Sequence, residues 1–158
     1  MFATHLHLLI NHMPVLSLFF GLALHFLSRF SQNRSLASIG NAFYIWAGFS
    51  VILVFLTGHG AEEFIEKSPS FSHSRFEAHE EAANIAFAIT LIAGVSALIQ
   101  WGLAFMNKKP KFLSLFIFAM ALAAFALNAR AGYLGGQIRH TELFPENNST
   151  SLNTGSTP

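Results

Sequence analysis

The sequence predicts an all-α integral membrane protein: a bundle of four transmembrane helices with both termini on the outer side. Hydrophobic residues make up 53% of the 158-residue chain and charged residues only 11%, about half of the usual charged share. The apolar residues fall into four runs, each close to the roughly 20 residues that a helix needs to cross a bilayer. Two short basic connections separate the first run from the second and the third from the fourth.

The first run extends from Leu6 to Leu27 and predicts a helix over about 5–28. No basic segment precedes it and no small-residue cleavage site follows it, so we expect it to be retained rather than removed as a signal peptide. The second run, Ile39–Thr57, predicts a helix over about 38–60. Irregular backbone cannot face lipid, so helices are the structure that such runs indicate.

The third and fourth runs predict helices over about 75–106 and 111–134. The third helix is expected to stand about two turns above its apolar part. Glycines near the end of the fourth are expected to loosen it; these are Gly132, Gly135 and Gly136. The four helices form one transmembrane domain, 1–142, and the Ser-, Thr- and Asn-rich segment 143–158 is expected to be a disordered polar tail.

The positions of Lys and Arg predict the orientation. The two short connections contain five basic residues and no acid; the five are Arg29, Arg34, Lys108, Lys109 and Lys111. Basic residues concentrate in cytoplasmic loops. Both termini and the long second connection are therefore expected outside, in the periplasm of a bacterium whose inner (cytoplasmic) membrane holds this multi-pass chain.

With four crossings, seven of the eight His and all eight Glu fall at the outer end of the bundle, and only His25 falls at the other end. His5, His7 and His12 begin the first helix. The ends of the other helices bring His59, Glu62, Glu63, Glu77, His79, Glu80, Glu81, Arg130, Arg139, His140 and Glu142. Helical spacing places the carboxylates of the third helix on one face and lets His79 turn inward with Ala86.

Four segments, NHMPV, TGHGAEE, HEEAAN and LGGQIRHTE, resemble the motifs of an uncharacterised family of small bacterial four-helix membrane proteins. The resemblance covers nearly the whole chain, to about Glu142, and implies the membrane fold without an activity. The matching residues are Asn11, His12, Pro14, Glu62, Glu63, His79, Glu80, Glu81, Gly136, Arg139, His140 and Glu142. It favours His12, His79 and His140 as the functional imidazoles.

The gathering of His and Glu predicts a transition-metal site in a redox or metal-handling protein. His12, His79 and His140 would supply imidazoles from three helices. Carboxylate ligands would come from Glu62, Glu63, Glu80 and Glu81, a mixture that suits Fe, Zn or Cu. Supporting roles are expected for Asn11, Arg130, Arg139 and Glu142, and His5, His7 and His59 are weaker candidates as ligands. Whether such a site catalyses a reaction is left open.

Two alternatives remain open. The first is a b-type haem protein for electron transfer, with two of His12, His79 and His140 on the iron and Arg130 or Arg139 beside the propionates. The second is a non-catalytic accessory or scaffold subunit, whose His and Glu form a polar cap on the helix ends. The chain has no Cys, which excludes disulfides and covalent haem attachment. A net charge of +1 gives no sign of nucleic-acid binding, so the expected partners are the lipid bilayer and other membrane or periplasmic redox proteins.

Overall fold

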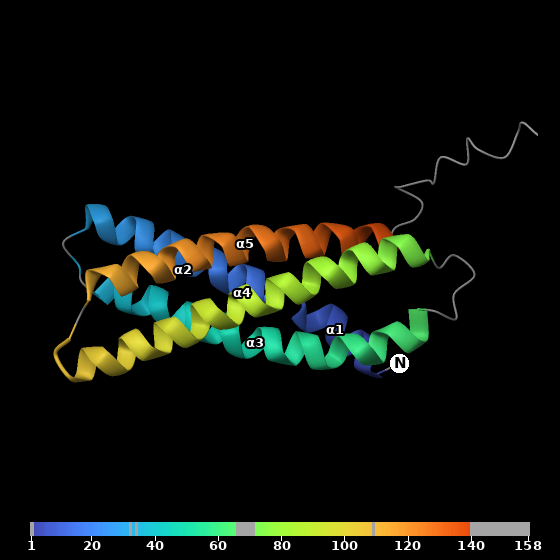
Figure 1. Ribbon diagram of the computed structural model, residues 1–158, viewed down its shortest axis with the longest axis horizontal. Coiled ribbons are helices and arrows are strands. Elements are labelled where there is room, and N and C mark those ends of the chain that lie inside the picture. The colour runs from blue at the N-terminus through green and yellow to red at the C-terminus, as the bar shows by residue number, and fades with distance from the viewer. Residues whose placement is uncertain (1, 32, 34, 66–71, 109, 140–158) are drawn as a thin grey trace, which may run out of the picture.

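The computed structural model describes residues 2–31, 33, 35–65, 72–108 and 110–139, and of residues 2–4, 59–65 and 139 it describes the backbone alone. The described chain is almost entirely helical, and four stretches are long and apolar enough to cross a membrane. They lie side by side in an elongated antiparallel bundle (Figure 1). The all-helical class and the number of spans are therefore as the sequence predicts.

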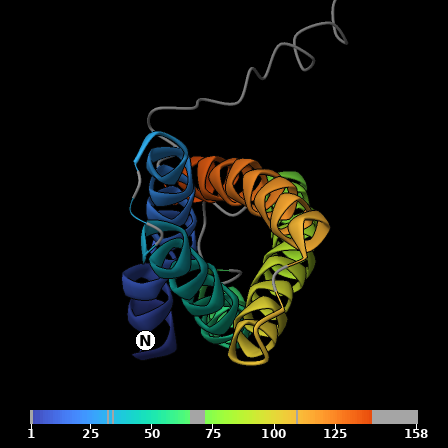
Figure 2. The same ribbon diagram turned by 90° about the vertical axis from the view of Figure 1, so that its left-hand side faces the viewer.

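Five helices build the bundle: α1 (Phe2–Ile10), α2 (Met13–Phe30), α3 (Ser35–Ile65), α4 (His73–Phe105) and α5 (Lys111–Arg139). Seen end-on, α2, α3, α4 and α5 form a ring in which each helix packs against the next and α5 returns to α2 (Figure 2). The helices α3, α4 and α5 have 31, 33 and 29 residues. They exceed the roughly 20 residues of a bilayer crossing, so part of each extends beyond the apolar layer.

The first membrane span is broken, in contrast to the single helix predicted over about 5–28. A turn at Asn11 and His12 separates α1 from α2. Pro14 lies in the first turn of α2, and it accounts for the break because it has no N–H to donate to the carbonyl of Ile10. On the N-terminal side of the turn, α1 packs mainly along α3 and diverges from α5 (Figures 1 and 2).

The last helix ends later than predicted. The expected end at Leu134 is wrong, because α5 continues to Arg139. The glycines that were expected to loosen this end remain helical, although each costs about 1 kcal/mol of helix propensity relative to Ala. Gly135 lies against the ring of His79, whereas a Cβ added to Gly132 or Gly136 would meet nothing within 4 Å among the described atoms.

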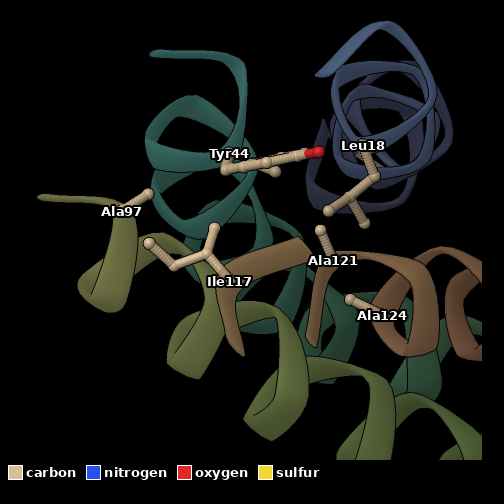
Figure 3. Close-up of a cluster of buried hydrophobic side chains, with 7 residues drawn as sticks. Leu18, Tyr44, Ala97, Ile117, Ala121 and Ala124 are labelled. Carbon is tan, nitrogen blue, oxygen red and sulfur yellow. The ribbon is translucent and has the colours of Figure 1, made fainter. Parts of the chain in front are cut away.

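Small residues bring the helices close together. The main cluster of buried apolar side chains includes Leu18, Tyr44, Ala97, Ile117, Ala121 and Ala124 (Figure 3). At the crossing of α3 and α4, a Cβ added to Gly94 would lie only 2.9 Å from the Cα of Gly48. Close backbone approach of this kind is how membrane helices gain packing energy, because lipid is as apolar as the side chains. Large apolar residues lie outside, and Phe105 and Phe112 are 79% and 80% exposed.

Polar side chains also join the helices within the bundle. Asn128 on α5 donates from Nδ2 to the hydroxyl of Thr90 on α4 at 2.8 Å. Near the α2–α3 and α4–α5 connections, Asn41 donates to Oε1 of Gln100 at 3.2 Å, and Gln100 donates to the hydroxyl of Ser114. These contacts satisfy polar groups that would otherwise be costly in an apolar layer.

Candidate metal or haem site

The start of α1, the end of α3, the start of α4 and the end of α5 lie at one end of the bundle (Figure 1). We call this the outer end. The two short basic connections lie at the opposite end. The antiparallel arrangement therefore gathers His and Glu positions at the outer end, as four crossings require.

His7 projects from α1 onto α3. Its Nδ1 lies 3.1 Å from the carbonyl oxygen of Val54 and 3.3 Å from the hydroxyl oxygen of Thr57. A carbonyl oxygen only accepts hydrogen bonds, so Nδ1 is the donor and carries the proton. The ring lies beside Gly58, where an added Cβ would be 3.6 Å from Cε1 of His7.

His79 makes the corresponding contacts between α4 and α5. Its Nδ1 lies 2.9 Å from the carbonyl oxygen of Ala131, and it is likewise the donor. A Cβ added to Gly135 would lie 3.1 Å from Cε1 of His79 and 3.3 Å from Nδ1. Each imidazole therefore binds a backbone carbonyl of a neighbouring helix and lies against a glycine of that helix. The glycine follows the carbonyl by four residues in both cases.

This anchoring leaves Nε2 of both rings with a lone pair when the rings are neutral. Among the described residues, none forms a hydrogen bond with either Nε2. Metal-ligating histidines characteristically donate their second ring N–H to a carbonyl or carboxylate, which fixes the ring and its tautomer. Each of the two anchored imidazoles, when neutral, can therefore supply one nitrogen ligand.

The other predicted ligands that the structure describes lie differently. His12 is exposed at the turn between α1 and α2, and its side chain makes no cap hydrogen bond. Glu80 and Glu81 are exposed on α4, while His79 turns inward above buried Ala86. In the described part of the chain, no three His or Glu side chains come together as a metal-binding group. Among the candidate ligands whose side chains are described, His7 and His79 are the two that bind a backbone carbonyl of a neighbouring helix.

Several predicted site residues cannot be compared in this way. The side chains of His59, Glu62, Glu63 and Arg139 lie outside those that the structure describes, although their backbone belongs to α3 or α5. His140 and Glu142 lie outside the described residues altogether. Their roles as ligands or supporting residues stay predictions.

The supporting residues have separate positions. Asn11 donates its backbone N–H to the carbonyl of His7 at 2.9 Å, and its Oδ1 is buried with no hydrogen-bond partner among the described groups. Arg130 and His5 are exposed. Arg75 donates to the carbonyl of Gln137 at 3.2 Å and ties the start of α4 to the end of α5.

Comparisons of this chain with family models, with curated proteins and with solved structures find no match. The resemblance of the four motifs to a bacterial membrane family stays a prediction.

Proposed function

We propose that this chain is a bacterial inner-membrane protein that binds a transition metal, as an ion or within a haem, at the periplasmic end of its bundle. Its role would be redox chemistry or metal handling at that surface. The observation that supports this most strongly is the pair of imidazoles, His7 and His79, each anchored through Nδ1 to a backbone carbonyl of a neighbouring helix.

The chemistry of the pair suits a metal better than a polar cap. Nδ1 of each ring donates to a carbonyl, and Nε2 of each neutral ring keeps a lone pair to which no described residue donates. Neutral imidazole is a good ligand for Fe, Cu and Zn, and the Nδ1–H bond to a carbonyl increases its basicity.

The predicted orientation of the chain in the membrane adds a location to this proposal. Arg29, Lys108 and Lys111, beside the two short connections, lie at the end opposite to the site, and such residues favour the cytoplasmic side. The site would then lie near the periplasmic interface, where membrane or soluble redox proteins can approach it. If the experiment below finds no bound metal or haem, its result would instead support a scaffold subunit.

A site of His and Glu around a bare ion is a second form of the proposal. It is favoured by α3, which carries Glu62 and Glu63 to the outer end beyond Gly58. His12 distinguishes the two forms. A three-imidazole ion site needs it, whereas a centre held by His7 and His79 does not.

The test compares metal and haem content of protein purified without a histidine tag. We expect His7→Ala and His79→Ala each to lose most of the bound metal, because each removes one anchored ligand. His73→Ala, at the exposed start of α4, is the matched control and should retain it. Loss in His12→Ala but not in His7→Ala would replace the pair with the three-imidazole site. Equal metal and haem content in all variants would exclude both the site of His7 and His79 and the three-imidazole site.

A further inference from the structure

We infer that the bundle binds a water molecule inside the apolar layer, where the water joins the hydroxyl of Tyr44 on α3 to the hydroxyl of Ser17 on α2. Tyr44 is fully buried, and its hydroxyl has no hydrogen-bond partner among the described groups. The residue lies well within the second membrane span, Ser35–Gly58. This water site is separate from the proposed metal site and does not depend on it.

Two glycines hold the ring of Tyr44 in its position. The ring lies against Gly21 on α2, where an added Cβ would be 2.7 Å from Cδ1 of Tyr44. In return, His25 of α2 lies against Gly40 of α3, where an added Cβ would be 2.5 Å from Nδ1 of His25. The two rings stack with their centroids 5.2 Å apart and their planes at 15°. Each helix therefore provides a glycine for the ring of the other, and the direction of the Tyr44 hydroxyl is fixed.

The hydroxyl of Tyr44 points to α2 beside Leu18 (Figure 3). Leu18, Ala121 and Ala124 belong to the same buried cluster and have no polar atom in their side chains. The backbone N–H and C=O groups inside these helices already bond to one another. A buried hydroxyl without a partner costs free energy, and buried polar groups that lack a protein partner are commonly paired with ordered water. Water is therefore the partner that these surroundings favour.

Ser17 is the polar side chain of α2 that is placed to complete the site. It precedes Leu18, lies one turn from Gly21 on the same face of α2, and is only 6% exposed. Its hydroxyl donates to the carbonyl of Met13 at 2.7 Å, so its oxygen keeps lone pairs that can accept. The water would accept from Tyr44 and donate to Ser17. Its second proton can bond to a helix carbonyl, because a carbonyl oxygen has two lone pairs.

Ser50 provides the matched control for Ser17. It is 1% exposed, and its hydroxyl donates to the carbonyl of Ala47 on its own helix at 3.0 Å. At about 100° per residue, it is turned by about 120° around the axis of α3 from Tyr44. Ser50 is thus as buried as Ser17 and bonded in the same way, but it lies on another face of the helix from Tyr44.

The first test is the unfolding equilibrium of Tyr44→Phe in detergent. The substitution removes the hydroxyl and keeps the ring against Gly21. Loss of the bonds to water should raise the unfolding constant about fivefold. A hydroxyl with no partner would give the opposite sign, because its removal relieves the cost of burying it. An unchanged or lower unfolding constant in Tyr44→Phe would therefore overturn the inference.

A double-mutant cycle tests the bridge to Ser17. Ser17→Ala should raise the unfolding constant several-fold in the wild-type protein and much less in Tyr44→Phe, where the water has already lost one partner. Ser50→Ala should have the same effect in both backgrounds. Equal effects of Ser17→Ala in the two backgrounds would contradict the bridge between Tyr44 and Ser17.

The water itself can be detected by NMR of full-length protein labelled with ¹³C-tyrosine. The chain has two tyrosines, and Tyr133, which is 59% exposed, is the reference. We expect a cross-peak between water and the ring of Tyr44 that is weakened in Ser17→Ala and kept in Ser50→Ala. The inference is wrong if Tyr44 shows no water cross-peak at a sensitivity that detects one at Tyr133.

Discussion

Gly58 and Gly135 determine how closely the two imidazoles approach the backbone. An added Cβ would be 3.6 Å from the His7 ring at Gly58, an ordinary contact, but 3.1 Å from the His79 ring at Gly135. The ring of His79 would have to move by a few tenths of an ångström, which alters its 2.9 Å bond to Ala131. A side chain at Gly135 is therefore expected to displace its neighbouring imidazole more than a side chain at Gly58 would.

This difference gives a paired prediction. Gly135→Ala should lower metal or haem occupancy severalfold, because displacement of an anchored ligand costs affinity. Gly58→Ala should have a smaller effect. Occupancy measured by elemental analysis and absorbance on the two variants checks this. A larger loss in Gly58→Ala than in Gly135→Ala would contradict the geometry.

The contacts of individual side chains were predicted from the sequence less well than the helices were. His79 was predicted as a ligand that turns inward, and the inward turn is confirmed by its bond to Ala131. His7 was placed below His12 because the motif resemblance includes His12. The acceptor of His7 is the backbone carbonyl of Val54, and a backbone acceptor has no signature in the sequence. The pairing of Asn41 with Gln100 was missed for a similar reason, since it joins positions 59 residues apart.

Among the helices, the sequence predicted the four membrane spans but not the break between α1 and α2. Four apolar runs specify four crossings by length alone. The break follows from Pro14, whose missing N–H was visible in the sequence, but a proline in a membrane helix is often tolerated as a kink. The turn directs α1 toward α3 and brings His7 to Val54.

Pro14→Ala tests the role of this break. The substitution restores an N–H for the carbonyl of Ile10 and favours one continuous helix. We expect helix content to stay equal or rise while occupancy falls several-fold, because His7 would leave its acceptor on α3. Circular dichroism and absorbance on the same sample provide both readings. Full occupancy in Pro14→Ala would show that the break does not position the ligand.

The crossing of α3 and α4 allows a stability prediction. An alanine at position 94 would place its Cβ 2.9 Å from Gly48 and 3.0 Å from the carbonyl oxygen of Tyr44. Gly94→Ala should therefore destabilise the bundle by about 1–3 kcal/mol, the usual cost of overpacking. Gly102→Ala, which meets nothing, should be neutral or slightly stabilising through helix propensity. Unfolding in detergent measures both, and equal stability of the two variants would contradict the close crossing.

For the whole molecule, the prediction concerns orientation. The chain lacks Cys, so single cysteines can be introduced without removing native ones. Ser31 and Ser74 are exposed at opposite ends of the bundle. In intact cells whose outer membrane admits small reagents, an impermeant maleimide should label Ser74→Cys and should label Ser31→Cys only after lysis. The reverse pattern would place the site on the cytoplasmic side.

The proposed function of the molecule requires a bound metal at the outer end. The most direct measurement is an absorption spectrum together with elemental analysis of untagged wild-type protein purified in detergent. The account predicts about one transition-metal equivalent per chain, and haem predicts a Soret band with iron in equal amount. Absence of both signals, after reconstitution with haem and with Fe, Zn and Cu ions, would contradict the central claim and leave His7 and His79 as structural contacts between helices.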